Sequence, residues 1–256
     1  MQFDDVPVQQ RDQAAAQKIT EFLNDGKRQF IYVNKIGAHF PIHDKYPDEF
    51  IRYTPILTRG SFLKVSDTGD REGIDGSAGD WTLYRNSYRN TLLWNVGAFF
   101  DTIIDKAELK DAMIIYTSDH GQTLHERGNP GLTTHCTPEP LMEEGTVPLV
   151  VISGKQNAGD EWRKAAAENH NKMSHYRIFP TVLNMMGYGA KDVIKTYGED
   201  LISNKADPFT FNTLFNARLG RKPVWKQIDI DSIPRPSVND YKPLNTADPK
   251  LVGNKK

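Results

Sequence analysis

Three short apolar segments constrain the fold of this chain more than any other feature of its sequence. Each is rich in β-branched and aromatic residues, as buried strands are. The expected strands cover residues 30–36, 112–116 and 147–153. Apolar residues recur at helical spacing around them, and the expected helices cover residues 12–24, 81–106, 161–169 and 175–186. Strands that alternate with helices predict an α/β fold whose sheet is at least partly parallel.

The composition is that of an ordinary globular protein, with 38% hydrophobic and 25% charged residues among 256. The formal net charge is −1 and the Lys and Arg residues are scattered, so nothing indicates a nucleic-acid partner. No apolar run approaches the roughly 18–20 residues that a membrane-spanning helix needs, and residues 1–5 do not resemble a signal peptide. We therefore expect this chain itself to be soluble. Its single cysteine, Cys136, cannot form an internal disulfide.

Side chains that can bind metals follow two of the expected strands directly. His39 comes just after the first strand, and Asp119 and His120 come just after the second. In open α/β sheets, functional residues gather at the carboxyl ends of the strands. An adjacent carboxylate and imidazole can both turn toward one metal ion where the backbone bends, and we expect Gly121 to supply the freedom to bend. His135 follows across a Gly-rich loop.

These four residues point to a metal site. Imidazole nitrogen and carboxylate oxygen are ligands that zinc accepts readily. We therefore treat Asp119, His120, His39 and His135 as candidate ligands of one or two zinc ions. The alternative is that the histidines are ordinary loop residues held by hydrogen bonds.

Two further histidines carry weaker signals. His43 lies four residues after His39, but Pro41 argues against a shared helix face, and we interpret His43 as a surface or substrate-facing residue. His175 opens an apolar helix for which Ser174 is the expected N-cap. It is either a helix-start histidine with a local hydrogen bond, or a residue that contacts a metal ligand or the substrate.

No catalytic nucleophile can be identified in the sequence. Phosphoryl or sulfuryl transfer through a covalent intermediate needs a hydroxyl or thiol that a metal or base activates. The residues that carry such groups near the candidate ligands are Ser118, Thr123, Thr133, Thr134 and Cys136. None of them stands at a separate strand-to-helix turn, where a nucleophile is usually presented. We interpret Cys136 as a small half-buried thiol beside the site, with a role as a metal ligand as the alternative.

Five segments, in order along the chain, resemble motifs of the phosphoethanolamine transferases in the alkaline phosphatase/sulfatase superfamily. Residues 35–41, followed by 46–50 and 53–55, are similar to the family's Gly-Ser-His-Gly-Pro segment and its Tyr-Pro-x-Glu-Phe sequel. Residues 88–93 match the family's Tyr-x-Asn-Thr-Leu-Leu helix.

The remaining motifs lie in the second half of the chain. Residues 116–124 resemble the Ser-Asp-His-Gly-Glu-Ser-Leu motif. Residues 135–138 and 147–148 resemble a Leu-His-Gly loop and the strand that follows it, and residues 174–183 resemble a Ser-His…Phe-x-Thr-Leu-Leu helix. Each motif alone is weak, but the ordered series over residues 30–190 is specific.

The resemblance implies an alkaline phosphatase/sulfatase-like sheet flanked by helices, with the N-terminal part of the domain missing from this chain. Residues 1–206 would form the C-terminal part of a sulfatase-like catalytic domain. Residues 207–256 are rich in Pro, Asn and Asp. They would form a C-terminal extension, for which this composition permits partial disorder.

For the site, the resemblance implies that Asp119 and His120 bind the zinc ion that also holds a nucleophilic threonine, a residue absent from this chain. A second metal or the phosphate of the substrate would be bound by His39 and His135. The expected substrate contacts are His175 and His43.

For the reaction, the resemblance implies transfer of phosphoethanolamine from a phospholipid donor to a lipid or sugar acceptor of the cell envelope, including modification of lipopolysaccharide. The parent protein would be anchored in the inner membrane through a segment absent here. Its catalytic domain would face the periplasm.

Some residues depart from the family pattern and leave the reaction open. Gln122 stands in place of a Glu, and His125, which we expect in a solvated loop beside the site, stands in place of a Gly. The cysteines of the family's disulfides are missing. The alternatives are a sulfatase- or phosphodiesterase-type hydrolase, or a catalytically incompetent fragment that retains the fold. Because two ligands of a four-ligand zinc site bind weakly by themselves, we expect this chain alone to be inactive.

Overall fold

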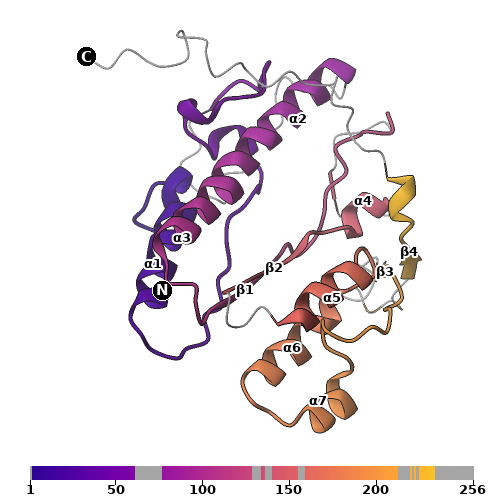
Figure 1. Ribbon diagram of the computed structural model, residues 1–256. Helices are drawn as coiled ribbons and strands as arrows, with labels where there is room; N and C mark the ends of the chain where they lie inside the picture. The colour runs from indigo at the N-terminus through magenta and orange to yellow at the C-terminus, as the bar shows by residue number, and fades with distance from the viewer. Residues whose placement is uncertain are drawn as a thin grey trace. The chain divides into compact units, whose positions relative to one another are not determined.

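The computed structural model describes residues 2–60, 77–128, 134–135, 140–154, 159–212, 220, 222 and 225–233. The chain divides into two compact units (Figure 1). The first unit contains the residues up to Glu108 and those from Leu124 to 128, and the second contains Leu109–Thr123 and the described residues from 134 to 233. Each unit is described by itself.

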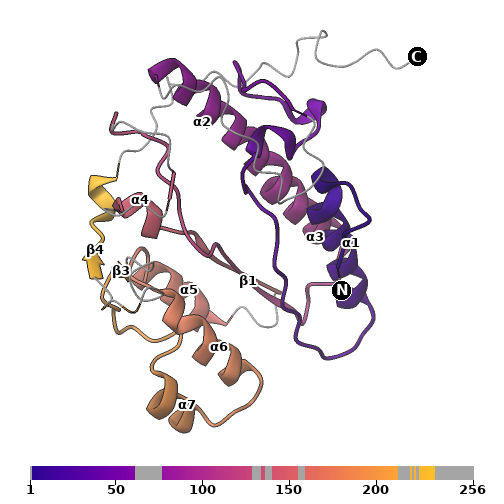
Figure 2. The same cartoon turned by 180° about the vertical axis from the view of Figure 1, so that it is seen from behind.

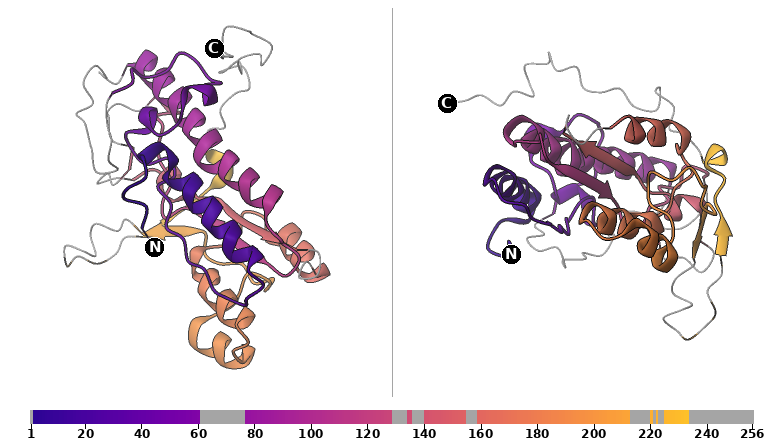
Figure 3. Two further views of the ribbon diagram at one scale, coloured as in Figure 1. Left: turned by 90° about the vertical axis from the view of Figure 1, so that its left-hand side faces the viewer. Right: turned by 60° about the horizontal axis from the view of Figure 1, so that its bottom comes forward.

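Helices form the frame of the first unit. A 3₁₀ turn over Val8–Gln10 leads into α1 (Arg11–Asn24). The helix α2 (Ala78–Leu92) continues through a π-helical segment (Leu93–Ala98) into α3 (Phe99–Lys106). The two helices predicted here from apolar spacing are therefore confirmed. α1 packs against α3, and the left view of Figure 3 shows the two helical runs side by side.

Buried polar side chains on α2 hold the loop that precedes it. Asn90 accepts hydrogen bonds from the N–H groups of Arg52 and Tyr53 and donates one to the Tyr53 carbonyl. The Ser87 hydroxyl accepts a hydrogen bond from the Leu57 N–H at 3.0 Å. Because buried backbone groups must find partners, these side chains do for the loop what a neighbouring strand does in a sheet.

The same loop contributes to the core of the first unit. Two 3₁₀ turns shape it, Ile42–Asp44 and Asp48–Phe50. The buried apolar side chains that pack together here are Ile42, Leu57, Trp81 and Tyr84. The core therefore joins the loop to the first turns of α2.

The strand predicted over residues 30–36 is wrong. This segment is extended, but the Tyr32 side chain is 81% exposed and no described part of the chain pairs with the segment in a ladder. A strand needs a neighbour for its backbone groups, and apolar composition alone does not supply one. A side chain fixes the end of the segment instead. The Asp12 carboxylate accepts hydrogen bonds from the N–H groups of Ile36 and Gly37, both at 2.9 Å.

Asp12 is also the anionic partner of a buried cation. Lys35 Nζ lies 3.0 Å from Asp12 Oδ2, 2.7 Å from the Asn95 carbonyl oxygen and 3.4 Å from the centre of the Phe99 ring. The two charged side chains are 12% and 3% exposed. Burial lowers the pKa of Lys35, whereas the attraction to Asp12 acts in the opposite direction. The pair joins α1 and the π-helical segment to the chain just before His39.

The second unit combines two small antiparallel sheets with short helices. β1 (Met113–Thr117) pairs with β2 (Leu149–Ser153), and β3 (Thr210–Asn212) pairs with β4 (Trp225–Gln227). The helices are α4 (Met142–Gly145), α5 (Asp160–Glu168), α6 (Ile178–Met185) and α7 (Ala190–Tyr197), with 3₁₀ turns at His175–Arg177 and Ile230–Ser232. α6 packs on α7 (Figure 2).

This mixture of helices and small sheets agrees with the expected α/β class. The strands predicted over residues 112–116 and 147–153 are confirmed as β1 and β2, and the helices predicted over residues 161–169 and 175–186 as α5 and α6 with its preceding turn. The expected parallel arrangement is wrong for the described strands. The chain leaves β1 at Thr117 and enters β2 at Leu149, opposite it, so β2 runs the other way.

Elements of a few residues were not predicted. β3 and β4 have three residues each, and α7 has eight, so their patterns are too short to stand out. Among the described residues, no helix combines the length and the apolar character that crossing a membrane requires.

Gly121 packs tightly where the chain leaves β1. Its N–H donates to the Glu144 carbonyl at 2.9 Å. A Cβ atom at this position would lie 2.0 Å from the Glu143 carbonyl oxygen and 2.5 Å from that of Thr146. Gly121 does not have a positive φ, and its expected role in bending the backbone stays a prediction. Glycine is needed here because the backbone around α4 approaches too closely for a side chain.

We expect Asp12→Ala to lower the free energy of unfolding by about 3–5 kcal/mol, because the Lys35 ammonium would stay buried without its partner. The double variant Asp12→Ala with Lys35→Met should recover most of this loss, since no charge then remains buried. Urea unfolding followed by circular dichroism measures both. Equal losses in the single and double variants would contradict the prediction.

We also expect Gly121→Ala to cost about 3 kcal/mol of unfolding free energy, the upper end of the usual range for overpacking, because a backbone carbonyl cannot rotate away from the new methyl group. Gly79→Ala is the matched control. Its Cβ would have only the Ser77 hydroxyl nearby, at 3.6 Å, and alanine favours the helix. A similar loss in both variants, measured by urea unfolding, would refute the close-packing argument.

Candidate metal and substrate site

The predicted Asp-His pair lies at the exposed end of β1. The Asp119 side chain is 89% exposed and that of His120 is 41% exposed. The Asp119 carboxylate accepts a hydrogen bond from the His120 N–H at 3.0 Å, and the Ser118 hydroxyl donates to the His120 carbonyl at 2.9 Å. These local bonds shape the turn that follows the strand, so both side chains are available at the surface.

His135 is brought to His120, as predicted. The two imidazole rings stack with centroids 4.5 Å apart and planes at 23°. The Thr123 N–H donates to the Thr134 carbonyl at 2.8 Å, and both threonines are buried. This backbone bond places His135, which directly follows Thr134, beside the end of β1.

One hydrogen bond of His120 decides which tautomer its neutral ring adopts. His120 Nδ1 lies 2.8 Å from the Gly121 carbonyl oxygen, which can only accept, so Nδ1 carries the proton in the neutral ring. The lone pair is then on Nε2, which lies 3.9 Å from Asp119 Oδ2. A histidine that donates one ring N–H to a carbonyl and offers the other nitrogen is the usual form of a metal ligand.

The donor atoms of Asp119 and His120 lie near the spacing that a shared metal ion requires. Two ligand atoms about 2.1 Å from a tetrahedral zinc ion would be about 3.4 Å apart, and His120 Nε2 lies 3.9 Å from Asp119 Oδ2, so the two side chains would have to approach each other to bind one ion. However, no three His, Cys, Asp or Glu side chains in the described part of the chain form a group that could hold a metal. Within the described residues, Asp119 and His120 are therefore a pair of candidate ligands and do not form a complete site.

His175 lies beside this pair through a long-range contact. Its Nε2 is 2.8 Å from the Thr117 hydroxyl, which is also 2.8 Å from the Pro148 carbonyl oxygen. A hydroxyl has one proton and a carbonyl can only accept, so Thr117 donates to Pro148 and accepts from His175 Nε2. The interpretation of His175 as a histidine with only a local hydrogen bond is therefore wrong.

Burial lowers the pKa of His175, while the Asp119 carboxylate and a hydrogen bond to the backbone of Ser118 act in the opposite direction. The imidazole is therefore mainly uncharged at neutral pH. Ser174 occupies the N-cap position as expected, but its side chain does not cap the turn. Its hydroxyl donates to Asp207 instead, a partner that the sequence analysis missed.

Two candidate residues belong to the first unit. His39 is exposed, and its Nδ1 lies 2.6 Å from the Phe40 carbonyl oxygen, which leaves the lone pair on Nε2 as in His120. His43 is buried, with Nε2 3.5 Å from an Asp44 carboxylate oxygen, so a surface position is wrong. Burial lowers the pKa of His43, and the attraction to Asp44 acts in the opposite direction. Its role toward substrate stays a prediction.

His125 is not solvated. It is buried, and its ring stacks on the Trp81 indole with centroids 3.8 Å apart. Its φ is +56°, in the region that favours glycine, which agrees with the glycine that the transferase motif has at this position. Thr133 and Cys136 lie outside the described residues.

Most of the chain is similar to known proteins. The family model described as Sulfatase matches residues 3–188. The Kdo(2)-lipid A phosphoethanolamine 7''-transferase of Escherichia coli (strain K12) is 27% identical over 177 residues, which cover 66% of this chain and 28% of that protein. The enzyme of the same name from Salmonella typhimurium (strain LT2) is 25% identical over 64% of this chain and 27% of its own length.

A third relative, the phosphatidylethanolamine transferase Mcr-1 of Escherichia coli, is 24% identical over 66% of this chain and 28% of its own length. The chain thus spans less than a third of the curated relatives it matches. No solved structure matches the chain. The family match confirms the expected alkaline phosphatase/sulfatase-like α/β fold class. Because that match covers well over half of its residues, the chain belongs to the sulfatase family.

Proposed function

We propose that this chain carries part of the metal site of a phosphoethanolamine transferase. One observation carries the proposal: Asp119 Oδ2 and His120 Nε2 face each other at the exposed end of β1, while His120 Nδ1 donates to the Gly121 carbonyl. The names of the curated relatives support this reaction, since all three are phosphoethanolamine or phosphatidylethanolamine transferases. The donor would be a phospholipid, and the acceptor a lipid or sugar of the cell envelope.

Zinc is the metal that the donor set favours. Nitrogen and carboxylate oxygen are common zinc ligands, and membership of the sulfatase family favours a metal-dependent reaction. Asp119 and His120 would hold the zinc, with His135 stacked on His120. His39 stays a proposed ligand. When bound, zinc would supply positive charge that activates a nucleophile and stabilises the phosphoryl oxygens.

The chain's own residues would bind and orient the substrate. His175 is uncharged and fixed by Thr117 next to Asp119, so it can contact a phosphoethanolamine group without competing for the metal through Nε2. His43 is the other proposed contact. The nucleophile would be a threonine outside this chain, so complete transfer would need more of the protein than is present here.

The location of the parent protein follows from the same proposal. An enzyme that modifies envelope lipids would work at the inner membrane, with its catalytic domain in the periplasm. The matched part of the relatives is less than a third of their length, so an anchoring segment would lie in the part that has no counterpart here.

We expect the chain to bind zinc, and the double variant Asp119→Ala with His120→Ala to lose at least about tenfold in affinity, because both donors of the half-site are gone. Isothermal titration with zinc, with metal content checked after dialysis, measures this. His170→Ala is the matched control, since His170 is exposed and distant in sequence from the candidate ligands. Equal affinity in the double variant would refute the metal site and favour an incompetent fragment that retains the fold.

We expect His175→Ala to weaken binding of O-phosphoethanolamine to the zinc-loaded chain about tenfold, which corresponds to the loss of one hydrogen bond. The zinc content should not change, because His175 is not a proposed ligand. Titration calorimetry with the zinc-loaded chain measures the affinity. Loss of zinc together with phosphoethanolamine binding would assign His175 to the metal rather than to the substrate.

A further inference from the structure

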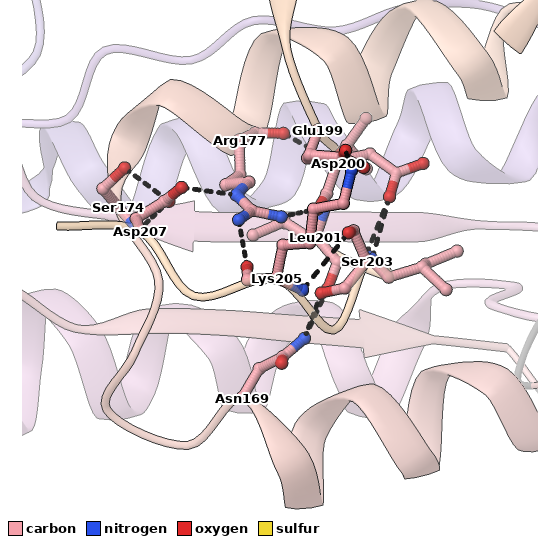
Figure 4. A network of polar contacts seen from close by, with 11 residues as sticks. Asn169, Ser174, Arg177, Glu199, Asp200, Leu201, Ser203, Lys205 and Asp207 are labelled. Atoms are coloured by element: carbon pink, nitrogen blue, oxygen red, sulfur yellow. Dashed lines mark hydrogen bonds and ion pairs between the residues drawn. The ribbon is translucent and has the colours of Figure 1, made fainter. Parts of the chain in front are cut away.

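Arg177 is a buried arginine whose guanidinium is committed to one segment of the chain. The residue is 2% exposed. Its Nε donates to Asp207 Oδ1 at 2.8 Å, its Nη1 donates to the Asp200 carbonyl at 2.8 Å, and its Nη2 donates to the Lys205 carbonyl (Figure 4). Burying a guanidinium without partners is costly, so these bonds fasten residues 200–207 to the start of α6.

Asp207 is the anionic partner in this arrangement, and it also holds Ser174. Its Oδ2 accepts hydrogen bonds from the Ser174 N–H at 3.1 Å and from the Ser174 hydroxyl at 2.8 Å, while Oδ1 accepts from Arg177 (Figure 4). The first N–H groups of a helix have no partner within the helix and favour a negative charge nearby. Asp207 therefore caps the turn that begins at His175, a function that no side chain of the turn performs.

The segment that carries Asp207 is itself well anchored. The Asn169 side chain donates to the carbonyls of Leu201 and Ser203 at 3.2 and 2.9 Å. The Thr181 hydroxyl accepts a hydrogen bond from the Leu201 N–H at 2.9 Å. These contacts anchor the segment 200–207 without involving His175. Variants that remove them therefore separate the stability of this segment from the positioning of His175.

The position of His175 follows from these contacts. The Asp207 carboxylate binds Ser174, directly before His175, and Arg177, two residues after it. The turn that contains His175 is therefore held on both sides. The side chain then reaches the Thr117 hydroxyl, 58 residues away, at the end of β1. A small shift of this turn would break a hydrogen bond of 2.8 Å, because such bonds weaken steeply with distance and angle.

We propose that Asp207 is a positioning residue that acts through Ser174 and Arg177 to hold His175 against Thr117. The substrate contact would then depend on the first residue of the extension predicted over residues 207–256. The positioning rests on the contacts above. Only its consequence for substrate depends on the proposed function, in which His175 contacts phosphoethanolamine.

The first test follows the His175 ring itself. Long-range ¹H–¹⁵N correlation of the imidazoles in the full chain, without metal or ligand, reports which nitrogen carries the proton and whether it is hydrogen-bonded. Thr117→Val supplies the signature of the lost contact. We expect Asp207→Asn to give the His175 signals of Thr117→Val, because an amide cannot accept both bonds from Ser174 and bond Arg177 as an anion does. His175 signals at the wild-type position in folded Asp207→Asn would overturn the proposal.

Two further variants guard against a general loss of structure. Asn169→Ala should leave the His175 signals unchanged, although it removes two bonds from residues 200–207. Ser174→Ala should give a smaller change than Asp207→Asn, since only the hydroxyl contact is lost. If Asn169→Ala shifts the His175 signals as far as Asp207→Asn does, the network is merely structural and the proposal fails.

The second test measures the consequence for substrate. In the zinc-loaded chain, Asp207→Asn should weaken O-phosphoethanolamine binding by the same factor as His175→Ala, and the double variant should be no weaker than His175→Ala alone. Additive losses would show that Asp207 acts by another route. If the wild-type chain binds no O-phosphoethanolamine, the proposed function fails, whereas the ring signals still decide whether Asp207 positions His175.

Discussion

Long loops with buried backbone groups impose the constraint on which both units of this protein depend. The described sheets are small, two strands each, so most of the extended chain cannot satisfy its N–H and C=O groups in ladders. Buried polar side chains take that role instead. Asn90 does so for the loop before α2, Asp12 for the turn before His39, and the Arg177–Asp207 pair for the segment after α7. Each of these side chains stands on a helix or is bonded to one, so helices fix these three segments.

This constraint explains which parts of the fold could be read from the sequence. The apolar spacing that identifies α1 and the α2–α3 run depends only on the residues of those helices. The apolar runs that identify β1 and β2 are likewise local to those segments. Residues 30–36 have the composition of a strand, but a strand is a relation between two segments, and composition cannot supply the partner. The antiparallel pairing of β1 with β2 was missed for the same reason, because it depends on where the connecting chain returns.

The candidate site divides in a similar way. The place of Asp119 and His120 directly after β1 could be predicted, and so could the approach of His135 to His120, whose rings stack in the structure, whereas their role as metal ligands stays a prediction. The surroundings of His125 and His43 could not be predicted, because they depend on burial in the folded chain. His125 looked solvated among polar neighbours, yet it fills a position beside Trp81, and His43 is buried next to Asp44. Asp207 gave no signal at all, since its partners Ser174 and Arg177 are 33 and 30 residues earlier in the chain.

The hydrogen bonds of the histidines separate their chemical roles more sharply than their positions do. In His39 and His120 the Nδ1–H is committed to the carbonyl of an adjacent residue, so the lone pair lies on Nε2, the nitrogen that a metal ligand offers. In His175 the Nε2–H is committed to Thr117, whose own proton goes to the Pro148 carbonyl. Its Nε2 therefore cannot bind a metal unless that contact breaks. A residue that keeps this contact in place, as Asp207 does through Ser174 and Arg177, would also keep Nε2 of His175 out of the metal's coordination.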